Sequence, residues 1–127
     1  MKRVIFNIRV IRLALSLVTA TLSLPAQQNA APPEGSWYGT NNGVSMNLTY
    51  RSGTCAYRDP YLNLPGNHCA WQPTATNGGI LTVFYDTYTV TQVFHNKLLI
   101  GVTYANRDRI VARLAPGPNG AATLDRQ

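Results

Sequence analysis

Apolar and polar residues alternate along most of the chain after residue 35, which is the spacing of β-strands, whose successive side chains point to opposite faces. The clearest run occupies 44–51. Its apolar positions are Val44, Met46, Leu48 and Tyr50. Asn42-Gly43 before this run favours a tight hairpin turn, because both residue types tolerate positive φ. The pattern therefore predicts a strand over 36–41 that folds back on the strand over 44–51.

A second tight turn is predicted at 52–53, Ser-Gly. A two-residue loop there places Tyr50 opposite Cys55, and it also places Leu48 opposite Tyr57. All four side chains then share the buried face, so the hydrophobic pattern and the pairing register agree. A further short strand is expected over 69–72.

The second half of the chain predicts a second meander. Strands are expected over 80–85, 88–94 and 98–104, joined by a two-residue loop at 86–87 and a three-residue loop at 95–97. In this register Tyr85, Tyr88 and Tyr104 fall in one cross-strand row.

A last strand follows a turn at 106–108. It should point Ile110, Ala112 and Leu114 inward and Arg109 and Arg113 outward. A two-residue turn instead would invert that strand, and the sequence leaves both possibilities open.

Strands joined by short turns, with no helical period beyond the N-terminal leader, predict an all-β fold. We expect an antiparallel up-and-down meander of about eight strands that closes, or nearly closes, into a barrel, because closure removes exposed edges. The barrel domain is predicted over 35–114. Residues 27–34 are interpreted as a linker, and 115–127, "APGPNGAATLDRQ", as a flexible tail.

The N-terminus is predicted to be a signal peptide over 1–26. Basic residues precede an uncharged apolar run, 13–25, which is shorter than the roughly 20 residues of a membrane span. Cleavage is expected after Ala26, or alternatively after Ala20, and an uncleaved anchor is the other possibility. The protein should therefore be secreted or periplasmic, with no membrane span after leader removal.

Leader removal lowers the formal net charge from +6, because the remaining part carries seven basic against five acidic residues. No basic patch is visible on the domain, so nucleic acid is not an expected partner. The two cysteines, Cys55 and Cys69, are predicted to form a disulfide, as in other exported chains. Closing this loop would stabilise the fold by about 3 kcal/mol in the chain-entropy model.

The start of the folded part, "GSWYGT" at 35–40, followed by a meander, resembles lipocalin-like and avidin-like barrels, the calycin group. It is also similar to small secreted protease-inhibitor barrels of bacteria, which share an early Gly-x-Trp and a disulfide. The resemblance implies that Trp37 closes one end of the barrel beneath an arginine of the last strand, here Arg109 or Arg113. Such a contact contributes about 0.5–2 kcal/mol.

Catalysis is not expected. The carboxylates of the folded part, Asp59, Asp86 and Asp108, lie in predicted turns, where Asp is favoured for local hydrogen bonding. A site built from the two histidines and the two cysteines would match no familiar zinc spacing. We therefore expect no catalytic residue, no metal and no cofactor.

Four residues on the predicted inner face are candidate ligand-binding residues: Tyr85, Tyr88, Gln92 and Tyr104. Small-molecule sites are apolar pockets with a few placed polar groups, and Gln92 is the only amide on this apolar face. Without a partner a buried amide costs about 1–3 kcal/mol. Alternatively, the tyrosines fill the core and Gln92 bonds to the backbone.

These features predict an exported binding module. The first hypothesis is a lipocalin-like carrier of a small apolar or amphiphilic ligand in the barrel interior. The alternative is a protein-binding module, such as a protease inhibitor, that uses loops or the N-terminal segment on an extracytoplasmic protein. A free apolar cavity would favour the carrier, and a filled interior with a protruding N-terminal arm would favour the protein-binding module.

Overall fold

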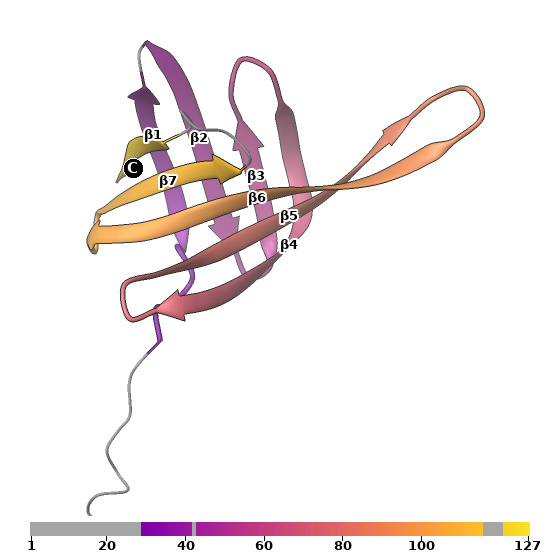
Figure 1. The fold of residues 1–127 in the computed structure, drawn as a ribbon. Coiled ribbons are helices and arrows are strands. Elements are labelled where there is room, and N and C mark those ends of the chain that lie inside the picture. The colour runs from indigo at the N-terminus through magenta and orange to yellow at the C-terminus, as the bar shows by residue number, and fades with distance from the viewer. Residues whose placement is uncertain (1–28, 42, 116–120) are drawn as a thin grey trace, which may run out of the picture.

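The chain forms an all-β antiparallel meander that closes into a barrel, as predicted (Figure 1). The computed structural model describes residues 29–41, 43–115 and 121–127. Each strand pairs with its neighbours along the chain, and the last pairs with the first. The strands are β1 (Gly35–Asn41), β2 (Val44–Arg51), β3 (Thr54–Arg58), β4 (Asn63–Ala75), β5 (Gly78–Tyr88), β6 (Val93–Asn106), β7 (Arg109–Ala115) and β8 (Ala121–Arg126). The predicted signal peptide at 1–26 lies outside the described residues.

The first two hairpins have the predicted registers. Asn41 pairs with Val44, which is the predicted register of the first hairpin. Tyr50 pairs with Cys55 across a second two-residue turn. That turn places Ser52 at φ 49° and the following glycine at φ 86°, the positive values that a type I′ turn requires.

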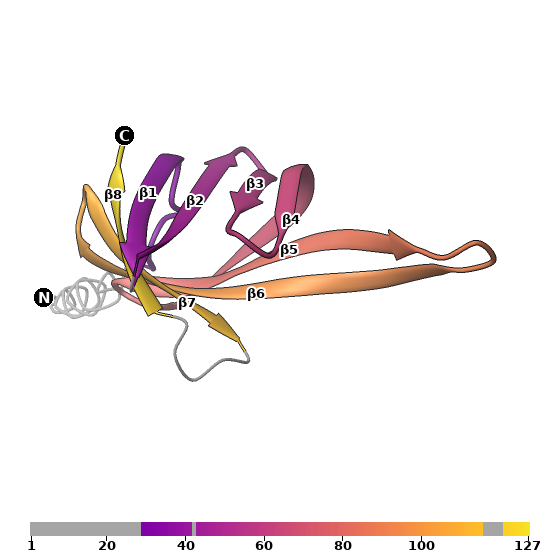
Figure 2. The ribbon, with the colours of Figure 1, turned by 90° about the horizontal axis from the view of Figure 1, so that it is seen from above.

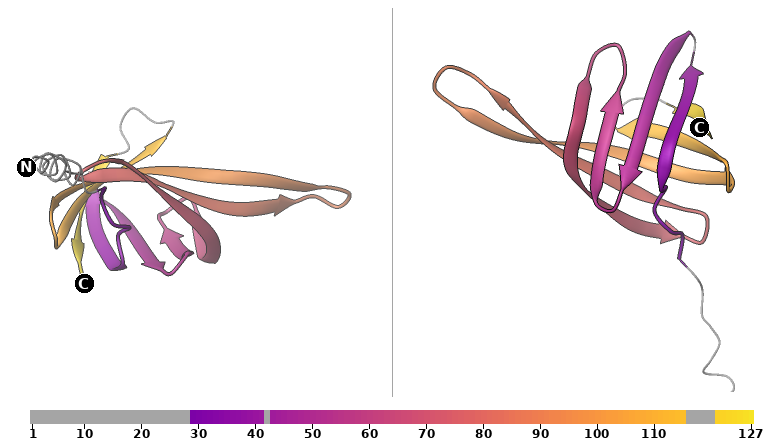
Figure 3. Two further views of the ribbon diagram at one scale, coloured as in Figure 1. Left: turned by 90° about the horizontal axis from the view of Figure 1, so that it is seen from below. Right: turned by 180° about the vertical axis from the view of Figure 1, so that it is seen from behind.

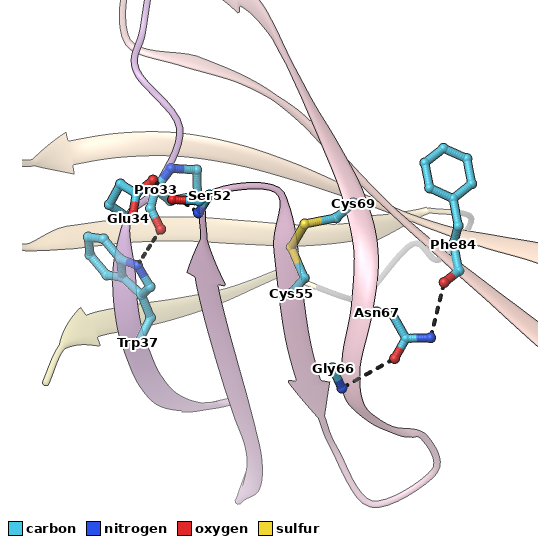
Figure 4. Close-up of a disulfide and its surroundings, with 9 residues drawn as sticks. All are labelled: Pro33, Glu34, Trp37, Ser52, Cys55, Gly66, Asn67, Cys69 and Phe84. Atoms are coloured by element: carbon cyan, nitrogen blue, oxygen red, sulfur yellow. Dashed lines mark hydrogen bonds between the residues drawn. A yellow bond between two sulfur atoms is a disulfide. The ribbon is translucent and has the colours of Figure 1, made fainter.

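The disulfide between Cys55 and Cys69 is present and joins β3 to β4, with 5.8 Å between the two Cα atoms (Figure 4). Next to it, the β3–β4 register shifts between Cys55 and Tyr57. A disulfide of this kind is typical of proteins that work in an oxidising, extracytoplasmic environment.

The second half of the chain differs from the prediction. The segment 78–106 forms two long strands and not three shorter ones, because the chain turns at 89–92, where the Thr89 N–H donates to the Gln92 carbonyl at 2.9 Å. The predicted loops are strand: Asp86 pairs with His95, and Tyr85 with Asn96. The β5–β6 hairpin runs well past the ends of the other strands (Figures 2 and 3). We call residues 84–98 the arm.

Strand β7 has the predicted inward and outward faces, although the turn before it differs from the predicted one. The turn has only two residues, since Asn106 pairs with Arg109. The inversion that such a turn would cause is offset by a register shift between Tyr104 and Asn106, which adds one residue to β6. Ile110 is therefore buried and Arg109 exposed.

The predicted flexible tail is wrong for its last part. Residues 121–126 form β8, which pairs with β7 through Ile110–Leu124 and with β1 through Trp37–Arg126. Leu124 is fully buried. The tail supplies the closing strand because the rest of the barrel would otherwise expose an edge on both β1 and β7.

Candidate binding site

The barrel interior is packed with apolar side chains from every strand. The buried members are Trp37, Met46, Leu48, Tyr50, Cys55, Tyr57, Leu64, Cys69, Leu81, Val83, Ile100, Val102, Ile110, Ala112, Ala122 and Leu124. They form one continuous cluster, with half-buried apolar side chains such as Leu98 and Leu114 packed against it. This interior is the region where a lipocalin-like carrier would hold its ligand, and side chains occupy it here.

Trp37 closes one end of this core. It is 1% exposed, and its indole Nε1 donates to the Pro33 carbonyl at 3.0 Å (Figure 4). A guanidinium lies over the indole ring, 4.3 Å from the ring centroid, but it belongs to Arg126 of β8. The resemblance therefore implied the right kind of contact from the last strand, while Arg109 and Arg113 were the wrong residues.

The two arginines named from the sequence have other places. Arg109 donates to the carboxylate of Asp125 on the neighbouring strand at 2.7 Å. This hydrogen bond raises the pKa of Arg109 and lowers the pKa of Asp125. Arg113 is exposed on the outer face of β7, opposite Gly101.

Residues 29–34, interpreted as a linker, lie against the Trp37 end of the barrel. The Ala30 N–H donates to the Ala75 carbonyl at 3.3 Å, and the Trp71 indole donates to the Ala30 carbonyl at 2.9 Å. The Tyr104 hydroxyl donates to the Ala31 carbonyl at 2.9 Å. This part of the N-terminal segment is therefore docked on the barrel and does not form a protruding arm.

The four candidate ligand-binding residues do not come together. Tyr104 lies at the Trp37 end, edge-on to that indole with 6.4 Å between ring centroids. Tyr85 is half-buried where the arm begins, Tyr88 is 71% exposed near its tip, and Gln92 is exposed in the tip loop. The predicted row depended on a turn at 86–87, and the observed turn at 89–92 separates its members.

Tyr104 lines a pocket beside the docked N-terminal segment. The pocket encloses about 580 Å³ and is also lined by Glu34, Asn106, Arg107 and Arg126. Burial raises the pKa of Tyr104, the charge of Arg126 lowers it, and the charge of Glu34 raises it. The pocket is thus an open depression at the barrel rim, with apolar residues of the N-terminal segment and charged side chains in its walls, and it does not lie inside the barrel.

The outer part of the arm, residues 87–94, presents uncharged and apolar side chains to solvent. No charged residue occurs between Thr87 and Phe94. Val90 at the tip is fully exposed, and Val93 and Phe94 are exposed as well. Sequence reasoning missed this site because the same alternating pattern is typical of a half-buried strand. The available signal was the adjacent pair Val93-Phe94, whose side chains must point to opposite faces.

A crevice opens between β4 and the base of the arm. The two strands pair from Ala75–Gly78 as far as Cys69–Val83 and then diverge. The crevice encloses about 470 Å³, and its walls are residues 65–67 on one side and Phe84, Tyr85, Asp86 and Tyr88 on the other. Two side-chain contacts bridge its inner end. Asn67 Nδ2 donates to the Phe84 carbonyl at 3.1 Å (Figure 4). The His68 ring stacks on the Phe84 ring, with 5.4 Å between the ring centroids.

Within the described residues, no group of three or more His, Cys, Asp or Glu side chains could hold a metal ion. No helix in the same part of the chain is long and apolar enough to cross a membrane. Comparisons with protein-family models, with curated proteins and with solved structures found no match.

Proposed function

We propose that this protein is an exported binding module that engages another protein through the arm. The single observation that carries the proposal is the exposed tip of the arm, where Val90, Val93 and Phe94 are exposed to solvent. The β5–β6 hairpin that carries this tip extends beyond the barrel (Figure 2). Clustered exposed apolar side chains mark interaction surfaces in soluble proteins. The protein-binding alternative of the sequence analysis is thereby favoured, with a hairpin in place of the N-terminal segment.

The packed interior supports the same choice. Small ligands bind in concave sites that bury most of their surface. Here fully buried side chains such as Leu81, Ile100 and Ile110 occupy the centre of the barrel. A ligand in the interior would have to displace them.

A partner protein is favoured over a lipid surface by the charges of the arm. Segments that lie on membranes carry clustered Lys and Arg beside their apolar face. The arm carries one lysine, Lys97, and its aspartate, Asp86, contacts His95 at 2.7 Å.

Binding without catalysis belongs to the proposal. Each aspartate of the barrel has a structural partner: Asp59 accepts from Tyr57, Asp86 contacts His95, and Asp108 and Asp125 accept from arginines. These contacts give each of these aspartates a structural role, which supports binding without catalysis.

The experiment places a photo-crosslinking amino acid at Val90 of the protein in cells that naturally export it. Val44 is the matched control, because it is also an exposed valine but lies on β2, outside the arm. We expect a discrete crosslinked protein from position 90 and not from position 44. Affinity for that purified protein should then fall at least about tenfold in Val90→Asp, about 1.4 kcal/mol, and stay within about twofold in Val44→Asp. Equal crosslinking from both positions, or a wild-type protein that binds anionic lipid vesicles through the tip and crosslinks to no protein, would contradict the proposal.

A second candidate is a small polar ligand in the rim pocket that Tyr104 and Arg126 line. The specific observation in its favour is the pair of arginine side chains, Arg107 and Arg126, beside an opening of about 580 Å³. Native mass spectrometry of protein purified from its own source tests this candidate. A bound mass that disappears on denaturation and is absent from Arg107→Ala would favour it over the protein partner.

A further inference from the structure

The arm has two edges, and the backbone groups along each can be assigned. Opposed residues in an antiparallel pair alternate between hydrogen-bonded and non-hydrogen-bonded pairs. The bond between the Thr89 N–H and the Gln92 carbonyl makes that pair a bonded one. Tyr88–Val93, Asp86–His95 and Phe84–Lys97 are then non-bonded pairs, whose backbone N–H and C=O groups point away from the hairpin.

Among the described residues, no strand pairs with the outer edge of β5 beyond Val83. The Phe84 carbonyl on this edge accepts from the Asn67 side chain of β4. This contact independently shows that the backbone N–H and C=O groups of the even-numbered residues point toward β4. The N–H and C=O groups of Asp86 and Tyr88 therefore point into the crevice of about 470 Å³.

The other edges nearby carry features that oppose strand addition. The edge of β4 across the crevice contains Pro65, which has no N–H, followed by Gly66. The outer edge of β6 carries His95 and Lys97, and charged side chains, lysine above all, discourage pairing. The β5 edge has aromatic residues, Phe84 and Tyr88, and its one charge, Asp86, contacts His95 at 2.7 Å.

We infer that the β5 edge at 84–88 is a site for strand addition by an extended peptide segment of another protein. Resting on the proposed function, this inference names the chemistry of the partner. The segment would hydrogen-bond to the backbone of Asp86 and Tyr88. Its alternate side chains would lie beside Phe84 and Tyr88, so apolar residues are expected at those positions. A second copy is disfavoured, since two-fold pairing about the centre of this edge would oppose two Asp86 carboxylates.

Two proline variants separate the edges. Asp86→Pro removes the outward N–H of the β5 edge, and His95→Pro removes that of the β6 edge. Neither substitution removes a hydrogen bond between β5 and β6, because Asp86–His95 is a non-bonded pair. Both variants lose the same side-chain contact at 2.7 Å. They are therefore matched in the hydrogen bonds and the side-chain contact that they remove, and they differ in the edge that they block. Tyr88→Pro and Val93→Pro form a second matched pair in case the first perturbs the arm.

The probe is a set of ten-residue synthetic peptides selected from a random displayed library against the full protein. We expect them to bind wild type and His95→Pro within about twofold of each other, and to bind Asp86→Pro at least about tenfold more weakly. Bound peptide should slow amide hydrogen exchange at Asp86 and Tyr88. The inference is overturned by a library that yields no binder, by peptides that bind Asp86→Pro as well as wild type, or by peptide-free self-association that protects these amides. The proposed function is judged separately, because it depends on Val90→Asp and the crosslinked protein.

Discussion

At the scale of single residues, Arg126 connects four parts of the barrel end. Its guanidinium donates to the backbone carbonyls of Glu34 and Arg107 and to the Asp108 carboxylate, and it lies over the Trp37 indole. The N-terminal segment, the β6–β7 turn and the first strand are thus tied to β8 by one side chain. The sequence indicated that an arginine would do this, but only the fold selects which one.

We predict that Arg126→Ala lowers the free energy of unfolding by about 1–3 kcal/mol, because it loses the cation–π contact and charge-assisted hydrogen bonds. Arg113→Ala is the control. Arg113 was one of the two residues named from the sequence, it is exposed, and its replacement should change stability by less than about 0.5 kcal/mol. Denaturant unfolding measures both values, and equal effects would remove Arg126 from this role.

Tyr57 is a second residue of interest, because its hydroxyl is bonded to a carboxylate and its side chain is buried. It is 1% exposed, and its hydroxyl donates to the Asp59 carboxylate. Burial, followed by the hydrogen bond and the charge of Asp59, raises the pKa of Tyr57 well above the ordinary tyrosine value of 10.0. The folded protein therefore keeps this proton at a pH where the unfolded chain has lost it.

This raised pKa predicts a pH dependence with a definite sign. The contribution of the Tyr57 proton to stability is fully present below the unfolded pKa of 10.0 and is lost as the pH rises above it. The free energy of unfolding should fall by up to about 1.4 kcal/mol per pH unit there, and Tyr57→Phe should remove this part of the slope. Tyr61→Phe is the control, since Tyr61 is 91% exposed. Parallel pH profiles for Tyr57→Phe and wild type would contradict the assignment.

At the scale of elements, the turns decided which predictions succeeded. The turns at 42–43 and 52–53 contain Gly after Asn or Ser, and their registers were correct. The predicted loop at Asp86-Thr87 lacks glycine, and a β-branched residue fits poorly where positive φ is needed. The observed loop instead uses the Thr89 hydroxyl, which accepts from the Gln92 N–H at 3.0 Å. The arm follows from this difference of a few residues.

The arm should be dispensable for folding. Because Tyr85–Asn96 is a hydrogen-bonded pair, residues 86–95 can be replaced by Asn-Gly, the preferred two-residue turn for such a pair. We predict that the shortened protein unfolds with a free energy within about 1 kcal/mol of wild type, since the removed residues are exposed.

The same replacement tests the function independently of folding. The shortened protein should keep its cooperative unfolding transition. It should no longer bind the partner protein that was identified by crosslinking from position 90 of the full chain. A large loss of stability would instead show that the arm is part of the folding unit.

At the scale of the whole molecule, barrel closure depends on a segment that looked like a tail. The run "APGPNG" at 115–120 led to this prediction, because Pro and Gly are typical of irregular segments. The six residues of β8 carry two buried apolar positions, Ala122 and Leu124, and Asp125 opposite Arg109. This short alternation was a usable signal, but so few residues do not distinguish a strand from a coil.

We predict that Leu124→Ala lowers the free energy of unfolding by about 2–5 kcal/mol, as for other fully buried leucines. Thr123→Ala, the exposed neighbour, should change it by less than about 0.5 kcal/mol. Chemical denaturation of both variants provides the measurement. If residues 121–126 did not close the barrel, both substitutions would be silent.

The sequence by itself determined the local features of this protein. Alternation gave the first three strands with their buried faces and the inward face of β7, Gly-containing turns gave two registers, and the cysteine pair indicated the disulfide. These features depend on residues close together in the chain, or on chemistry that only one pair of side chains can perform. They were sufficient to predict a closed meander, because a set of amphipathic strands must bury one face and cover its edges.

Only the tertiary structure decided which arginine covers Trp37 and which segment closes the barrel. It also decided where the candidate ligand-binding residues of the second half lie. In each case the local sequence pattern fits the alternatives almost equally well. Arg109, Arg113 and Arg126 all lie near the end of the chain, and the 86–87 and 89–92 turns both preserve alternation in their flanking strands. Long-range pairing of β8 with β1 and the packing of one shared core select among them. The outer part of the arm, residues 86–95, is exposed for the same reason: the core is filled without these side chains.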